Sequence, residues 1–246
     1  MSKQIDDIFS GIYADYDSMN HLLSMGVDTI WRRAAANEAL IEKKSYRVLD
    51  IAAGTGEFAI RMAKTARENG RNIQIVGVDY NKGMLSVGKR KIAARGLSNI
   101  TLEHGDAMSL KYSDSSFDAV TSAFALRDFD SLDRLFKETK RVLKNGGKFV
   151  FLDMAMPDDR FGRAFFKQYF KVLKIVGAFV DKNAYDFLFE SIMKFDKQNL
   201  IRIAKRNGFE NVNSHSLLSG VGYYVSGEKR KPARASLSSP ARRSPL

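Results

Sequence analysis

The chain has 246 residues, of which 44% are hydrophobic, a size and composition that suit one α/β domain with additions. It contains no cysteine and only three dispersed histidines, which argues against disulfides, thiolate metal sites and a histidine-built metal site. No apolar run approaches the roughly 18 residues of a membrane-spanning helix, and the polar, acidic start is unlike a targeting signal, so we expect a cytoplasmic protein.

Five strand-like segments follow one another along the first two thirds of the chain, and each precedes a helical pattern. They are residues 46–52, 73–80, 100–106, 117–125 and 148–155. This alternation predicts a parallel sheet with helices on both faces. Two later strand candidates, 211–218 and 221–228, lie close enough to form a hairpin, which would make one edge of the sheet antiparallel. We therefore predict a three-layer, Rossmann-like α/β fold around a mostly parallel, seven-stranded sheet.

Segments outside this pattern divide the chain. We expect residues 1–44 to form an N-terminal helical lid and residues 45–228 to form the main domain, with a helical insertion at about 158–196. Residues 229–246 form a basic tail that has almost nothing to bury, so we expect disorder there. The tail is either a tether for anionic lipid or nucleic acid, or a solvated extension without a role; it carries part of the net charge of +12.

The most informative short stretch is VLDIAAGTGEF, residues 48–58. A buried-looking strand runs into a turn made of Gly54, Thr55 and Gly56 and then into a helix, as in nucleotide-binding βα turns. The two glycines let the backbone approach a ligand closely, because no Cβ intervenes. The turn alone does not distinguish a cofactor that carries phosphate from one that does not.

Acidic residues at the ends of the first three strands indicate which cofactor is bound. Asp50, Asp79 and Asp106 stand where ligands bind in an open parallel sheet, and no lysine or arginine is obvious beside the glycine turn. A pyrophosphate would be repelled by on the order of several kcal/mol at such a site. The cationic S-adenosylmethionine fits better, because Asp79 can accept the ribose hydroxyls and Asp106 the adenine amino group. The alternative is that these are three unrelated turn aspartates.

Several motifs resemble those of class I methyltransferases. They are VLDIAAGTGEF, VGVDYNKGML, GDAMSL and RVLKNGG, over most of residues 45–150. YDSMNHLLSMGVDTIWRR (16–33) closely resembles the signature of the ubiquinone/menaquinone biosynthesis C-methyltransferases, the UbiE/MenG family, and FALRDF (124–129) and YDFLFESIMKF (185–195) agree with it. The resemblance implies the class I methyltransferase fold and S-adenosylmethionine-dependent methylation of a ring carbon of a polyprenylated quinol, such as demethylmenaquinol or a ubiquinol precursor.

Carried over onto this chain, the cofactor positions of the family fall on Thr55, Asp79, Asp106 and Ala107. The chain departs from the family pattern at four positions near the fourth and fifth strands. Ala123 replaces a serine, Ala125 a glycine, Asp128 an asparagine and Asn145 a proline. The change to Asp128 bears most on which substrate is used and on how its ring hydroxyl is held.

Two residues after the fourth strand are our candidates for catalysis. A quinol ring is most reactive with one hydroxyl deprotonated, and that hydroxyl has a pKa of about 10, like that of tyrosine. Arg127 would stabilise the developing phenolate, because arginine stays charged and donates in a fixed fork. Asp128, or else Asp15 and Asp17, would accept the proton. Without the resemblance, LRD would be interpreted as an exposed turn.

The N-terminal stretch offers a lid over the cofactor. Its candidate residues are Tyr16, Asn20, Trp31 and Arg32, which would exclude water on closure. The alternative is an amphipathic helix pair packed on the sheet. Its buried face would contain Leu22, Leu23, Val27 and Ile30. Both interpretations can hold together.

The aromatic insertion, beginning RFGRAFFKQYFKVLKIVGAFV, mixes cations such as Arg163, Lys167, Lys171 and Lys174 with bulky apolar residues. It suits a surface that meets a polyprenyl tail and anionic lipid heads, and the alternative is an ordinary core helix. We therefore expect a lipid quinol substrate at the membrane surface, with peripheral attachment; a homo-oligomer is compatible with the sequence. Two other classes stay open: a nucleic-acid methyltransferase, for which no recognition module is visible, and a non-catalytic S-adenosylmethionine-binding protein.

Overall fold

The computed structural model describes residues 21, 24, 26–157, 159–177, 182–217 and 220–231. Seven strands form one sheet in the order β3-β2-β1-β4-β5-β7-β6. The strands are β1 (Ser45–Ile51), β2 (Asn72–Asp79), β3 (Ile100–His104), β4 (Phe117–Ala123), β5 (Leu143–Met154), β6 (Phe209–Leu217) and β7 (Gly222–Lys229). Strands β1 to β5 are parallel to one another, whereas β7 runs antiparallel to both β5 and β6. The predicted sheet and its antiparallel hairpin are confirmed.

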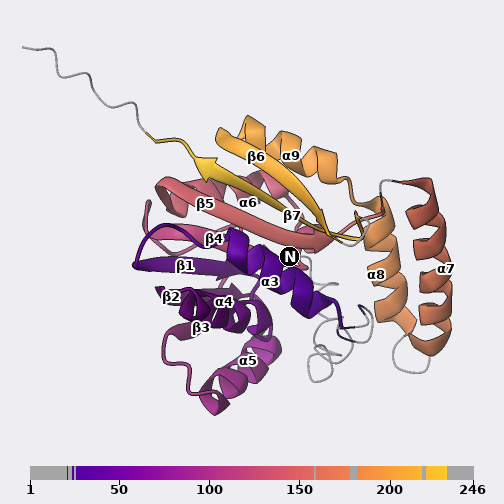
Figure 1. The fold of residues 1–246 in the computed structure, drawn as a ribbon, viewed down its shortest axis with the longest axis horizontal. Coiled ribbons are helices and arrows are strands. Elements are labelled where there is room, and N and C mark those ends of the chain that lie inside the picture. The colour runs from indigo at the N-terminus through magenta and orange to yellow at the C-terminus, as the bar shows by residue number, and fades with distance from the viewer. Residues whose placement is uncertain are drawn as a thin grey trace, which may run out of the picture.

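Helices cover both faces of the sheet (Figure 1). They are α3 (Asp28–Glu38), α4 (Glu57–Glu68), α5 (Lys82–Ala94), the 3-10 turn η1 (Leu126–Asp128), α6 (Leu132–Val142), α7 (Arg160–Gly177), α8 (Lys182–Lys194) and α9 (Lys197–Arg206). Successive strand residues face opposite sides, so Val48 packs in the core under α3, α4 and α5, and Leu49 packs in the core under α6 and α9. The result is the predicted three-layer arrangement.

The N-terminal helix α3 packs on the sheet by a face different from the one we predicted. Its buried apolar residues are Trp31, Ala35 and Ala36, the last two lying four and five positions after Trp31 on one side of the helix. The prediction was wrong for Ile30, which is 64% exposed because it lies about 100° around the helix from Trp31. Val27 is half-buried against the core, and Leu22 and Leu23 lie outside the described residues.

The C-terminal boundary of the main domain also needs correction. Strand β7 continues through Lys229, whose Nζ donates a hydrogen bond to the carbonyl oxygen of Leu143 at 2.7 Å. Lys229 therefore belongs to the sheet rather than to the basic tail. The stretch 232–246 of that tail lies outside the described residues.

Helices α7 and α8 occupy the predicted insertion between β5 and α9. Figure 1 shows α7 at the periphery of the molecule, with α8 between it and the sheet. Helix α8 also packs against η1, the turn that follows β4. Among the described helices, none is both long and apolar enough to cross a bilayer.

Candidate active site

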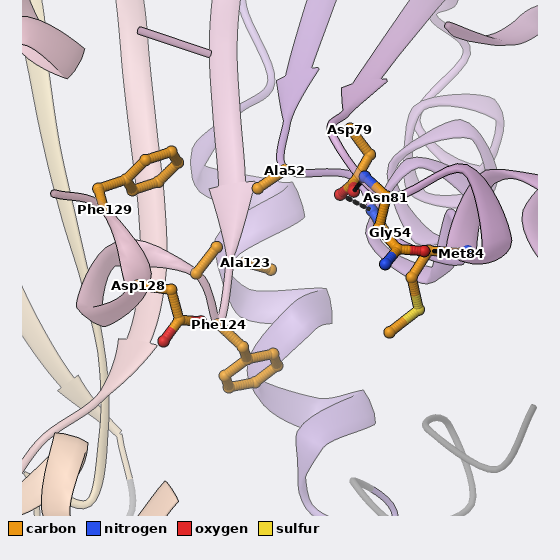
Figure 2. A pocket seen from close by; sticks show the side chains of 10 residues that line it. Ala52, Gly54, Asp79, Asn81, Met84, Ala123, Phe124, Asp128 and Phe129 are labelled. Atoms are coloured by element: carbon orange, nitrogen blue, oxygen red, sulfur yellow. Dashed lines mark hydrogen bonds between the residues drawn. The ribbon is translucent and has the colours of Figure 1, made fainter. Parts of the chain in front are cut away.

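A cleft lies at the carboxyl edge of the sheet, where β1 and β4 are neighbours and the order of the strands reverses. Such a switch point is where open α/β sheets bind ligands. The cleft is lined by Ala52, Gly54, Asp79, Asn81, Met84, Ala123, Phe124, Ala125, Asp128 and Phe129. In Figure 2, Gly54, Asp79 and Asn81 gather at one end of it, and Phe124, Asp128 and Phe129 at the other. We call these the Asp79 end and the Asp128 end.

Backbone donors hold the carboxylate of Asp79. The Gly54 N–H donates to its Oδ2 at 2.7 Å, and the Asn81 N–H donates to its Oδ1 at 2.8 Å (Figure 2). Asn81 in turn accepts a hydrogen bond from the Met84 N–H at 2.9 Å and thereby caps α5. The acid that the sequence assigns to a ribose is thus oriented at the cleft by two rigid loops, after β1 and after β2.

The glycine turn has the conformation that its residues predict. Gly54 and Gly56 have φ values of 55° and 78°, in the left-handed region where a Cβ is disfavoured. Gly56 is the N-cap of α4. Gly54 lines the cleft, so the backbone can approach a ligand there without a side chain intervening.

A second hollow adjoins the Asp79 end. It is lined by Ala52, Val78, Asp79, Tyr80, Gly105, Asp106, Ala107 and Phe129. Asp106 accepts a hydrogen bond from the Met108 N–H at 2.8 Å through Oδ1, which fixes its side chain. The structure therefore brings Asp79, Asp106 and Ala107 together, at the place where the sequence predicts ribose and adenine.

The placement of Asp50 differs from our prediction. Its side chain is buried between β1 and β4, 1% exposed, and accepts a hydrogen bond from the Thr121 hydroxyl at 2.8 Å. Burial raises the pKa of Asp50 to about 7, an effect that Thr121 and the charge of Arg32 oppose and the charge of Asp79 reinforces. Its Oδ2 has no hydrogen-bond partner among the described residues. Asp50 therefore lies beneath the cleft rather than at its surface.

Thr55 also faces away from the cleft. Its side chain is buried, and its hydroxyl accepts a hydrogen bond from Lys91 Nζ at 3.1 Å. A lysine thus does reach the glycine turn, which corrects the expectation that none lies beside it. Lys91 is paired with Glu57 at 2.6 Å, so the turn gains no net positive charge from it. Because Glu57 neutralises Lys91, a pyrophosphate at the turn would still be repelled by the aspartates of the cleft.

The turn LRD is neither an exposed turn nor a source of a cleft-facing guanidinium. The Arg127 side chain is 5% exposed and pairs with Asp153, with Nε 2.7 Å from Oδ1, while its Nη1 donates to the Ser191 hydroxyl of α8 at 2.8 Å. Asp153 also accepts hydrogen bonds from the backbone N–H groups of Leu126 and Met154. Arg127 therefore joins the end of β5 to the insertion and holds η1 in place.

Asp128 is the ionisable side chain that lines the Asp128 end. It is 7% exposed, and burial raises its pKa to about 7, with Arg127 opposing the shift and Asp153 adding to it. Burial alone would lower the pKa of Arg127, but Asp153 and Asp128 raise it, so the guanidinium stays charged. A carboxyl group that titrates near neutral pH in a cleft is suited to proton transfer.

Phe124 connects the N-terminal helix to the cleft. Its ring lies 6.4 Å from the ring of Trp31 and 4.7 Å from the guanidinium carbon of Arg32, both measured to its centroid. Trp31 and Arg32 are buried and do not line the cleft themselves, but both lie against Phe124, which does. Tyr16 and Asn20, the other predicted lid residues, lie outside the described residues, as do the alternative bases Asp15 and Asp17.

Sequence reasoning missed several residues that build the site. Asn81, Met84, Phe124 and Phe129 line the cleft, and Asp153 supports it from behind. The pattern D-x-N after β2 carries a helix-capping signal that could have identified Asn81. No local signal links Asp153 to Arg127, because the two are 26 residues apart in the chain.

The fold and the cleft together define a class I S-adenosylmethionine-dependent methyltransferase. A methyltransferase structure from Thermotoga maritima superposes with a TM-score of 0.64 at 19% identity, covering 91% of this chain and 99% of that one. A phosphoethanolamine N-methyltransferase from Haemonchus contortus, in complex with S-adenosylmethionine, superposes with a TM-score of 0.59 at 19% identity, covering 81% of this chain and 52% of that one. This chain therefore spans about half the length of the Haemonchus protein. At these identities the likeness shows the fold.

The chain belongs to the ubiE/COQ5 methyltransferase family, whose model matches residues 1–229. A demethylmenaquinone methyltransferase of Deinococcus radiodurans is 40% identical over 93% of both chains. The ubiquinone/menaquinone biosynthesis C-methyltransferase UbiE of Rickettsia felis is 34% identical over 88% of this chain and 89% of its own. The family resemblance predicted from the motifs is confirmed.

The residues present fit S-adenosylmethionine. Asp79 and Asp106 supply acceptors at the surface of the cleft, and Asp50 offers a buried carboxylate oxygen without a partner beneath it. A cofactor with two cationic groups and no phosphate is attracted by these acids, whereas a pyrophosphate is repelled. Among the described residues no cluster of acids and histidines could hold a metal ion.

Proposed function

We propose that the protein transfers a methyl group from S-adenosylmethionine to a ring carbon of a polyprenylated quinol, demethylmenaquinol or a ubiquinol precursor. The family and the named relatives support the reaction class. The observation that carries the proposal is the Asp128 end of the cleft, where one carboxyl group with a pKa of about 7 stands among apolar and aromatic residues. This lining suits an aromatic ring that must lose a proton.

The reaction needs a proton acceptor at the Asp128 end of the cleft, and Asp128 is the residue that can supply it. S-adenosylmethionine, when bound, supplies an electrophilic methyl carbon on its sulfonium. Asp128 accepts a proton from a ring hydroxyl with an ordinary pKa of about 10, which raises the electron density on the neighbouring carbon. On taking the methyl group, that carbon would leave the cofactor as its neutral thioether, and the carbon's own hydrogen leaves as a proton to solvent. The proton held by Asp128 then returns to the ring oxygen, so the ring is an aromatic quinol again and one proton is released overall. The apolar lining excludes water and strengthens the charge interactions.

Arg127 has a role different from the one the sequence suggested. Its Nε and Nη1 already donate hydrogen bonds to Asp153 and Ser191. We therefore assign Arg127 the role of positioning the turn η1, and not of contacting the phenolate directly. It holds η1, and its charge limits the rise in the pKa of Asp128. The ionised form of Asp128 is thereby present near neutral pH, which is the form that accepts a proton.

The test is turnover with a short-chain quinol that dissolves in water. The protein is incubated with labelled S-adenosylmethionine and the reduced quinol, and the product is identified by mass spectrometry and by loss of a ring C–H signal in NMR. We expect carbon methylation of the quinol and none of the corresponding quinone. Methylation at oxygen would contradict the mechanism, and cofactor binding without turnover on any quinol would favour the non-catalytic alternative.

A further inference from the structure

Helix α7 exposes two phenylalanines on its outer face. Phe161 is 87% exposed and Phe165 is 69% exposed, and they stand one helical turn apart. Phe166 and Phe170 of the same helix are 2% and 1% exposed. The outward pair is therefore additional to the packing of the insertion, since Phe166 and Phe170 already supply buried side chains on another side of the helix.

Cations share the exposed surface of this helix. Arg160, Arg163, Lys167 and Lys171 are all exposed. The helix contains no aspartate or glutamate, and no ion pair joins these four cations to a described residue. Their charge is therefore not neutralised within the described part of the chain.

The two kinds of side chain are segregated around the helix axis. At about 100° per residue, Phe161 and Phe165 project within about 40° of each other. Arg160, Lys167 and Lys171 form a second arc about 120° away, and the buried phenylalanines form a third. A helix that offers an aromatic strip beside a cationic strip, with a buried face against its own protein, has the pattern of a membrane-surface helix.

The place of α7 in the fold suits the same partner. Figure 1 shows α7 farthest from the sheet on this side, with α8 between the two. Helix α8 in turn packs on η1 and bonds Arg127 through Ser191, beside the Asp128 end of the cleft. A surface that contacts α7 therefore lies on the side of the molecule where we place the quinol ring.

We infer that the outer face of α7 docks on an anionic lipid bilayer, with Phe161 and Phe165 at the boundary of headgroups and acyl chains and the cations against lipid phosphates. The inference rests on the proposed function, since a polyprenylated substrate resides in the bilayer. Charge favours lipid over a second copy of this chain, because a two-fold contact would bring the four cations of each α7 against those of the other.

Vesicle binding by the full-length protein tests this inference. Flotation is measured with vesicles of phosphatidylglycerol and phosphatidylcholine, and with phosphatidylcholine alone. We expect binding to the anionic vesicles that weakens with salt, because surface charge attraction is screened over about 10 Å at 0.1 M. Phe161→Ser with Phe165→Ser should lower the partition coefficient at least about tenfold. Lys167→Glu with Lys171→Glu should lower it by a similar factor and remove most of the salt dependence.

A matched control uses the exposed apolar side chain of α3. Ile30 is 64% exposed, and Ile30→Ser should leave vesicle binding unchanged. Equal losses in the Ile30 and the double phenylalanine variants would overturn the assignment to α7. So would a double phenylalanine variant that binds vesicles as wild type does, or one that converts a dimer to a monomer in light scattering while wild type ignores vesicles.

Turnover separates this inference from the proposed function. The double phenylalanine variant should methylate a water-soluble quinol at the wild-type rate and lose at least about tenfold with a polyprenylated quinol in vesicles. Wild-type turnover of the soluble quinol without vesicle binding would overturn the docking inference alone. Vesicle binding that depends on α7, without turnover of any quinol, would overturn the proposed function and leave the docking surface in place.

Discussion

At the Asp79 end of the cleft, backbone N–H groups of two loops orient the functional carboxylate. At the Asp128 end, the side chains of Asp153, Arg127 and Ser191, from β5, η1 and α8, hold the functional turn. Backbone donors are fixed by the sheet and its turns, so the Asp79 end is formed whenever the sheet is. At the Asp128 end, the bond from Arg127 to Ser191 also ties the turn to α8, so this end depends on the docking of the insertion as well as on the sheet.

The two ends also differ in electrostatic cost. The Asp79 carboxylate sits at the cleft surface among backbone dipoles. The Arg127–Asp153 pair is almost fully buried, so each charge depends on the other for its stability. Removing one partner should therefore cost far more at this end than removal of an exposed ion pair elsewhere.

The largest expected effect concerns Asp153. Asp153→Ala leaves the Arg127 guanidinium buried without its partner, and we expect the free energy of unfolding to fall by about 3–5 kcal/mol. Urea denaturation measures it. Asp114→Ala, which removes an exposed partner of Arg141, is the control and should have a much smaller effect. Similar losses in the two variants would show that the Asp128 end does not rest on the buried pair.

The next effect concerns turnover. Asp128→Asn restores the asparagine of the family pattern and keeps the shape of the side chain, but it cannot take a proton. Because no other ionisable side chain lines this end among the described residues, we expect the kcat of this chain to fall by about 10²-fold at pH 8. Wild-type kcat should rise with pH and level off above about pH 7, where Asp128 is ionised, and the variant should lack this step. Affinity for S-adenosylmethionine, measured by calorimetry, should not change. A wild-type pH profile in the variant would mean that another group takes the proton.

Cofactor affinity should respond at the other end. Asp79→Ala removes the carboxylate assigned to the ribose, and we expect binding of S-adenosylmethionine to weaken by about 1.5–3 kcal/mol. Calorimetry gives the dissociation constant, and Asp128→Asn serves as the matched carboxylate control across the cleft. Equal losses in both variants would break the division of the cleft into a cofactor end and a substrate end.

A smaller effect is expected from Asp50, beneath the cleft, on the pH dependence of the free energy of unfolding. Its folded-state pKa of about 7 lies above the value of about 3.9 in an unfolded chain. Its contribution to stability is therefore fully present below about pH 4 and is lost as the pH rises through about 7. Relative to Asp50→Asn, we expect the wild-type free energy of unfolding to fall by on the order of 2 kcal/mol between about pH 5 and pH 7.5. A pH-independent difference would mean that Asp50 stays ionised throughout.

The smallest effect is expected at Ala125, where the family pattern has glycine. Ala125 has φ −126°, which any residue adopts, so the glycine is not required by the backbone. Ala125→Gly should change the free energy of unfolding by less than about 1 kcal/mol, through the entropy of the unfolded chain. Thermal melting detects it. A loss well beyond that range would show that the methyl group of Ala125 supports the Asp128 end.

The difference between the two ends also explains what the sequence could predict. Alternating hydrophobic segments specify the seven strands, and the ends of parallel strands meet at one edge, so Asp79 and Asp106 could be placed together. Burial of Asp50 could not be foreseen, because it depends on Thr121 in a strand 71 residues away. The partners of Arg127, Asp153 and Ser191, are likewise far away in the sequence. No neighbouring residue indicates that Arg127 is buried, so LRD has the sequence of an exposed turn.

The sheet order has a consequence for how the protein is made. Strand β7 is the last strand of the described residues, yet it lies inside the sheet between β5 and β6. During synthesis on the ribosome, β6 emerges before β7, the strand with which it pairs. The edge of β5 also stays unpaired until residues 222–229 have been synthesised. An unpaired strand edge invites pairing with other chains. Translation that stops before β7 would therefore yield an aggregation-prone polypeptide rather than a shortened enzyme, because the edges of both β5 and β6 are paired by β7.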